Sequence, residues 1–127
     1  DTNEQLLDNC DVLVSAVTEM PDLSCGDDTK YQEGILLVPI HTRGFQNCDL
    51  FFDHVYADDK GHVEGFKYFS QFKAFNELSE VLLGKVQGRV NNKQRILAYN
   101  IGIGLHDVLF ANKIYSKLTN DRRFIEI

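Results

Sequence analysis

The chain has 127 residues, a hydrophobic content of 43% and a formal net charge of −6 at pH 7, so it is long enough for one globular domain and lacks the composition of a disordered protein. We expect neither nucleic-acid binding, because Lys and Arg are few and scattered, nor a membrane span, because no run approaches about 18 consecutive apolar residues. The three cysteines, Cys10, Cys25 and Cys48, form no CxxC pair, which predicts structural thiols in a reducing, cytoplasmic compartment and no metal site.

The predicted elements alternate between helices and strands. A short helix with Leu6 and Leu7 on its inner face leads into residues 10–17, an apolar run that contains three valines. Because apolar and polar residues do not alternate in this run, it predicts a parallel strand covered on both faces. Residues 34–40 predict a second strand. His41 follows it, at the carboxyl edge where ligands of open α/β sheets bind.

A third strand is predicted at residues 50–57. Asp53 and His54 interrupt its apolar pattern, which indicates a position nearer the edge of the sheet. A polar connection at residues 86–95 then precedes a final strand at residues 96–99. Strands that alternate with helical stretches predict an α/β fold with a mostly parallel sheet.

Apolar residues recur at every third position between the third strand and the polar connection. They are Val63, Phe66, Phe69, Phe72, Phe75, Leu78 and Val81. A period of three drifts by about 60° per step on a 3.6-residue helix, so we predict two helices that meet near Phe72. The second is lined by Phe75, Leu78 and Leu82. Gly84 ends it, as glycine often does at a helix C-terminus.

The last strand runs into a turn with two glycines, residues 100–104, and then into an amphipathic helix. The apolar stripe of this helix comprises Leu105, Val108, Leu109, Tyr115 and Leu118. Small residues before a helix N-terminus are a common seat for a polar ligand. Simple helix packing is the competing interpretation.

Three segments together resemble the ornithine cyclodeaminase and mu-crystallin family. Residues 6–18, LLDNCDVLVSAVT, are similar to a family segment in which an acidic residue precedes an apolar strand, and the strand is followed by a small residue, an alanine and a threonine. Residues 77–89, ELSEVLLGKVQGR, resemble its run of Glu-Leu, Val-Leu, Gly and Gly-Arg. Residues 96–115 resemble its terminal strand, turn and helix. The resemblance spans residues 1–118 and leaves 119–127 as a polar C-terminal tail.

The resemblance implies that the chain is the C-terminal part of a Rossmann-like NAD(P)-binding domain, a partial three-layer α/β fold cut from a larger enzyme. Family members use NAD or NADP for hydride transfer at an amino or imino acid. The GxGxxG fingerprint and the substrate domain precede the matched region in the family, and the chain contains no such fingerprint. We therefore expect the fragment to be inactive alone, and to pair its exposed sheet edge with another copy as a homo-oligomer.

The resemblance also implies cofactor contacts in two loops. They are Ser15, Ala16 and Val17 after the first strand, and Asn100, Ile101 and Gly102 after the last. Two competing interpretations stay open. Ser15 can be a small core residue, and the amide of Asn100 can be satisfied by neighbouring groups of the protein.

The chain departs from the family pattern at His41. The family's cyclodeaminases carry a catalytic aspartate three residues before a glycine, and counting back from Gly44 gives His41. Because a histidine moves protons near neutral pH, His41 predicts a changed acid-base group and a different amino or imino acid. A surface-loop histidine is the competing interpretation. The alternatives in function are a non-catalytic nucleotide or small-ligand binding protein of the mu-crystallin type, and a flavodoxin-like signalling domain.

Overall fold

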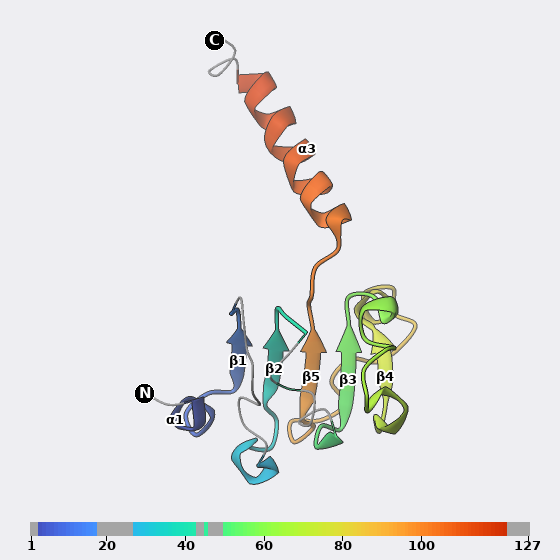
Figure 1. The fold of residues 1–127 in the computed structure, drawn as a ribbon. Coiled ribbons are helices and arrows are strands. Elements are labelled where there is room, and N and C mark those ends of the chain that lie inside the picture. Colours follow the sequence, from blue (N-terminus) through green and yellow to red (C-terminus); the bar gives the residue numbers. More distant parts are fainter. Residues whose placement is uncertain (1–2, 18–26, 43–44, 46–49, 122–127) are drawn as a thin grey trace.

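Five parallel strands form the single sheet of the computed structural model, which describes residues 3–17, 27–42, 45 and 50–121. The strands are β1 (Val12–Ser15), β2 (Leu36–Pro39), β3 (His54–Ala57), β4 (Phe75–Glu77) and β5 (Ile96–Tyr99), in the spatial order β1-β2-β5-β3-β4. All five arrows in Figure 1 point toward one edge. The structure therefore confirms a parallel α/β sheet of partial Rossmann-like character.

Strand β5 lies at the centre of the sheet and all four of its residues are buried. It pairs with β2 through Ile96 and Leu97, and with β3 over its whole length. Since successive side chains of a strand point to opposite faces, Leu97 and Tyr99 enter one cluster of buried residues, whereas Ile96 and Ala98 enter the other. The short apolar run at the predicted final strand is thus the middle of the sheet.

The larger cluster lies on the face that α1 (Asn3–Leu7) helps to cover. Leu7 is 1% exposed and belongs to this cluster, but Leu6 is 47% exposed. The predicted inner face of the first helix is therefore confirmed for Leu7 and wrong for Leu6, because this five-residue helix presents only one of the two leucines to the core.

The second face is covered in part by α2 (Leu78–Leu82). Its Leu78 and Val81 pack against the second cluster, which consists of Tyr56, Ile96 and Ala98. On β1, by contrast, Val12 and Val14 are each 54% exposed. The prediction that the strand within residues 10–17 is covered on both faces is wrong, because β1 ends the sheet while α2 packs on β3 and β5.

Strand β3 lies between β5 and β4, and its four residues are buried, so the predicted position near the sheet edge is wrong. The polar ring of His54 is accommodated inside the protein. It stacks on Tyr56 with 4.1 Å between ring centroids, and its Nε2 lies 3.0 Å from Asn76 Oδ1. A histidine with such partners can occupy an interior strand at little cost, because buried polar groups need hydrogen bonds.

The apolar residues that recur at every third position lie, between residues 63 and 72, in a series of 3-10 turns. The N–H groups of Val63, Phe66, Phe69 and Phe72 each donate to the carbonyl three residues earlier, at 2.9–3.2 Å. Two short 3-10 helices, η3 (Lys60–His62) and η4 (Phe69–Gln71), lie in this stretch. The first predicted helix is wrong, because three residues per turn is the 3-10 geometry. The phenylalanines are nonetheless partly buried against the core.

The second predicted helix divides into strand β4 and helix α2. The carboxylate of Glu80 accepts the N–H of Glu77 at 3.1 Å, which caps the start of α2. Gly84 ends this helix with φ +69°, as predicted. Leu82 is 87% exposed, so its predicted place on the inner face is wrong. The pattern did not predict β4, because Phe75 continued the helical series.

Helix α3 (Gly104–Asp121) leaves the carboxyl edge of the sheet and extends away from it, as Figure 1 shows. The predicted stripe of this helix is exposed, from 37% at Leu118 to 70% at Leu105. The helix includes the first three residues of the predicted tail 119–127, and residues 122–127 lie outside the described part. Within that described part, no helix is both long and apolar enough to cross a membrane.

We expect Leu97→Ala to lower the free energy of unfolding by about 2–5 kcal/mol, because it leaves a cavity in the central strand. The matched variant Leu82→Ala makes the same chemical change at an exposed position, and its effect should stay within about 0.5 kcal/mol. Urea denaturation followed by circular dichroism measures both. Equal losses would contradict the described positions of the two leucines.

Candidate functional site

The carboxyl ends of four strands are joined by backbone hydrogen bonds into one edge. Each bond links a strand end to its neighbour: Ile40 N–H to Ser15 O at 2.8 Å, Asn100 N–H to Pro39 O at 2.9 Å, and Asp58 N–H to Tyr99 O at 3.0 Å. The loops after β1, β2, β5 and β3 therefore follow one another along the edge. Most of the residues predicted for cofactor or proton chemistry lie on these loops.

Ser15 and His41 are in direct contact at this edge. Ser15 Oγ lies 2.8 Å from His41 Nε2, although 26 positions separate the two residues in the sequence. The register of β1 on β2, which pairs Ser15 with Pro39, brings them together. Phe45, itself 3% exposed, lies against the imidazole with 5.9 Å between ring centroids. His41 is consequently a partly buried side chain with a defined partner rather than a free surface histidine.

The loop after β5 begins with Asn100, which is half-buried and whose Nδ2 lies 3.4 Å from Ala98 O. The side chain of Ile101 is half-buried and packs against the larger core cluster. Gly102 has φ +101°, and no atom lies within 4 Å of the place where a Cβ would stand. Glycine is therefore needed there for its backbone conformation, which L residues rarely adopt, and not because of crowding.

The loop after β1 continues from Ser15 into Ala16 and Val17. Both of these residues are exposed, Val17 to 41%. Of the predicted cofactor residues, the structure thus places Ser15 against His41 and Asn100 against the end of β2, while Ala16 and Val17 lie open at the end of the edge strand. Gly44, from which the position of His41 was counted, lies outside the described residues.

Asp58 is a buried side chain at this edge that the sequence pattern did not predict. Its side chain is 4% exposed, and Oδ2 accepts the N–H of Gly102 at 2.6 Å. Oδ1 lies 3.2 Å from Nδ1 of His62 and 2.8 Å from the N–H of Asp59. A carboxylate that accepts several N–H groups is held firmly. The signal that could have found it is its position as the first polar residue after the apolar strand 54–57.

Asp58→Ala should lower the free energy of unfolding by about 1–3 kcal/mol, because it leaves the N–H of Gly102 without its acceptor. Asp8, an exposed carboxylate, gives the control Asp8→Ala, whose effect should stay within about 0.5 kcal/mol. Urea denaturation compares the variants, and amide hydrogen exchange at Gly102 should accelerate in Asp58→Ala only. Unchanged exchange would show that this bond does not hold the turn.

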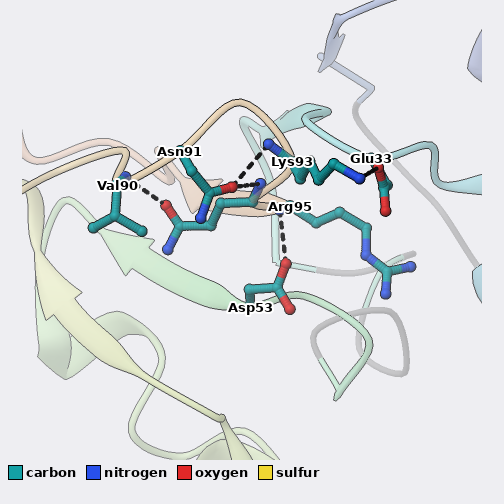
Figure 2. A pocket seen from close by; sticks show the side chains of 7 residues that line it. Glu33, Asp53, Val90, Asn91, Lys93 and Arg95 are labelled. Atoms are coloured by element: carbon teal, nitrogen blue, oxygen red, sulfur yellow. Dashed lines mark hydrogen bonds and ion pairs between the residues drawn. The ribbon is translucent and has the colours of Figure 1, made fainter.

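A hollow of about 550 Å³ lies at the opposite, amino edge of the sheet, and Figure 2 shows its lining. Its charged side chains have partners within the protein. Lys93 pairs with Glu33 at 3.1 Å, and Arg95 donates to the carbonyl of Tyr31 at 3.5 Å. Because these charges are already engaged, this hollow is a weaker candidate than the carboxyl edge. Within the described ranges, no group of three or more His, Cys, Asp or Glu side chains could hold a metal ion.

Asp53 ties two strands together beside this hollow. Its Oδ2 accepts the N–H of Arg95 at 2.9 Å, and its own N–H donates to Arg95 O at 3.0 Å. Burial opposes ionisation of Asp53, but the N–H of Arg95 and the ammonium of Lys73, 3.4 Å from Oδ1, outweigh it and lower the pKa of Asp53. The charged form of Asp53 therefore stabilises the folded protein.

The lowered pKa of Asp53 predicts a pH-dependent effect of Asp53→Asn. Stability from a carboxylate with a lowered folded pKa is present above its unfolded value of about 3.9, and it is lost as the pH falls through the folded value. The variant should thus be less stable than the parent near neutral pH, and the two should converge in acid. Denaturation at several pH values measures this difference, with Asp8→Asn as control. A gap that stays constant with pH would contradict the role of the charge.

Comparison with known proteins gives a curated relative and a solved structure, while no protein-family model matches the sequence. The nodulation efficiency protein NfeD of Rhizobium meliloti is 29% identical in an alignment of 112 residues, which covers 83% of this chain and 35% of that protein. The crystal structure described as a probable ornithine cyclodeaminase from Bordetella pertussis Tohama I aligns with a TM-score of 0.77 at 18% identity. That alignment covers 96% of this chain and 43% of the other.

These comparisons bear on the fold more than on the chemistry. At 18% identity, the structural likeness shows that nearly the whole chain adopts a fold found within a probable ornithine cyclodeaminase. The chain spans about a third of the length of the curated relative that it matches. The comparisons therefore do not establish the activity of the whole protein.

Proposed function

We propose that this chain is the NAD(P)-binding portion of an enzyme similar to ornithine cyclodeaminase, which acts on an amino or imino acid by hydride transfer. The observation that carries the proposal is the structural alignment with a TM-score of 0.77 over 96% of the chain. The contact between Ser15 and His41 and the position of Asn100 on the same carboxyl edge support it, since open α/β sheets bind their ligands at that edge.

The residues of this edge suit part of a dinucleotide site. No protein atom lies within 4 Å of the place where a Cβ of residue 102 would stand, and the exposed residues Ala16 and Val17 lie on the same edge. In the proposal, the loop of Ser15 to Val17 and the loop of Asn100 to Gly102 hold the cofactor. NAD or NADP, when bound, supplies or accepts the hydride, while the protein contributes binding, orientation and proton transfer.

His41 is the proposed acid-base group. A neutral imidazole accepts a proton from an ammonium or amine, and an imidazolium returns one to an imine nitrogen. The hydrogen bond between Ser15 Oγ and His41 Nε2, at 2.8 Å, orients the ring, and Phe45 limits its movement. An imidazole at this place differs from an aspartate because it carries no fixed negative charge. This difference supports a substrate other than ornithine.

The remaining parts of the proposal concern the whole protein. Because the match covers 35% of the curated relative and 43% of the solved structure, we propose that further chain supplies the rest of the cofactor site and the substrate domain. The present chain would then not turn over substrate by itself. We also propose that the whole protein is a cytoplasmic homo-oligomer. Light scattering would measure its mass in solution.

Calorimetric titration of the full-length protein with NADH and NADPH tests this function. We expect one of the two to bind. Asn100→Ala should raise the Kd roughly 3- to 10-fold, as expected for one lost hydrogen bond worth about 0.5–1.5 kcal/mol. Asn112→Ala, which changes an exposed asparagine of α3, serves as the matched control. Failure of both nucleotides to bind would refute the proposal.

A non-catalytic binding protein of the mu-crystallin type is the second candidate. What favours it is the histidine at position 41, where the family resemblance implies an aspartate. This candidate predicts nucleotide binding without turnover. Reduction of NAD(P)+ that depends on an added amino acid would exclude it. Binding without reduction, over a broad panel of amino and imino acids, would favour it over the enzyme.

A further inference from the structure

The two ring nitrogens of His41 have very different surroundings. Nδ1 is buried and has no hydrogen-bond partner among the described residues, whereas Nε2 lies 2.8 Å from Ser15 Oγ. A proton can leave or reach an imidazole only at a ring nitrogen. Since Nδ1 faces no partner, the route between His41 and the carboxyl edge runs through Nε2, and Ser15 stands on that route.

The hydroxyl of Ser15 can transmit a proton because it both donates and accepts. A serine hydroxyl has one O–H donor and two acceptor lone pairs. The contact with Nε2 engages it on one side and leaves capacity on the other. Ser15 is also only half-buried, and it is the last residue of β1, immediately before the open loop. Ser15 is therefore more accessible at the carboxyl edge than the buried Nδ1 of His41 is.

The backbone fixes this pair before any ligand binds. Ser15 O accepts the N–H of Ile40 at 2.8 Å, and Ser15 lies opposite Pro39 in the parallel register. His41 follows Ile40 directly, so the distance between Oγ and Nε2 depends on the joined ends of two strands. A pair held by strands is preorganised, which acid-base chemistry requires.

We propose that Ser15 and His41 form a proton relay in which Ser15 Oγ contacts the ligand and His41 acts through it as the proton reservoir. The proposal rests on the proposed function for its ligand, the basic nitrogen of an amino or imino acid. In one direction, Oγ gives its proton to the ligand nitrogen and takes the proton of Nε2. The net change is one proton moved from the imidazolium to the ligand, and the reverse transfer restores the pair.

The relay contrasts with the role that the family resemblance implies for Ser15, a cofactor contact. A cofactor contact needs only the position of the residue and does not depend on the state of His41. A relay needs a hydroxyl on Ser15 and an imidazole at position 41 together. Loss of either member should thus have the same effect, and loss of both should add little, because groups that act as a unit are non-additive.

Nitrogen-15 NMR of the histidine rings tests the contact without cofactor or substrate. The resonances of His41 are identified by their absence in His41→Gln. We expect Ser15→Ala to shift the Nε2 resonance of His41 and change its tautomer populations, Ser15→Thr to retain most of the parent pattern, and Ser70→Ala, an exposed serine, to change nothing. An unchanged His41 spectrum in Ser15→Ala would overturn the relay.

Kinetics of the full-length protein provide the second arm. We expect Ser15→Ala and His41→Gln each to lower kcat by roughly 10²- to 10⁴-fold and to remove the same limb of the pH profile. The double variant should be no slower than about the worse single variant, and Ser15→Thr should recover activity. A rise in KM for the nucleotide with kcat and pH profile retained in Ser15→Ala would reduce Ser15 to a cofactor contact and overturn the relay.

The two arms separate this proposal from the proposed function. If the full-length protein without substitutions neither binds NAD(P) nor reduces it, the proposed function fails. The assignment of an amino or imino acid as the ligand of the relay then fails as well. The NMR comparison still decides whether Ser15 controls the protonation of His41. If nucleotide reduction is observed and only His41→Gln impairs it, His41 acts directly, and the relay alone is refuted.

Discussion

Strand β5 is the constraint on which the rest of the structure depends. It is hydrogen-bonded on both sides, and its four residues are buried. Because its neighbours β2 and β3 run parallel to it, the polar residues that follow all three strands must meet at one edge. The next backbone groups of the chain extend this arrangement, since Asn100 bonds to the end of β2 and Gly102 to Asp58 after β3.

The turn after β5 depends in particular on one buried carboxylate. Asp58 is almost fully enclosed, and a charge in such a place is stable only when donors surround it. The N–H of Gly102 is one of these donors, at 2.6 Å, and this bond links the end of β3 to the start of the segment that leads into α3. The left-handed turn at Gly102 is therefore anchored by a residue that follows another strand, β3.

The local sequence pattern was sufficient to predict those strands whose own residues determine that they are buried. The apolar runs 34–40 and 96–99 predicted β2 and β5, because four or more consecutive apolar residues bounded by polar ones fit a buried strand. Neighbours decided the rest. Whether β1 is covered depends on where α2 lies. His54 tolerates burial because Asn76 on the neighbouring strand β4 contacts its Nε2, while Tyr56 of its own strand stacks on its ring.

The apolar residues at every third position show a second way in which a sequence pattern can mislead. Their spacing is that of a 3-10 helix, but it was interpreted as two α-helices. Hydrogen bonds to the third preceding carbonyl at Phe66, Phe69 and Phe72 fit the series without any drift. The contact between Ser15 and His41 was beyond any local pattern, since 26 residues separate them and only the β1–β2 register joins them. That register changes the chemistry expected of His41. An imidazole whose Nδ1 is buried and whose Nε2 contacts a hydroxyl is held in one orientation and does not rotate freely as a loop side chain would.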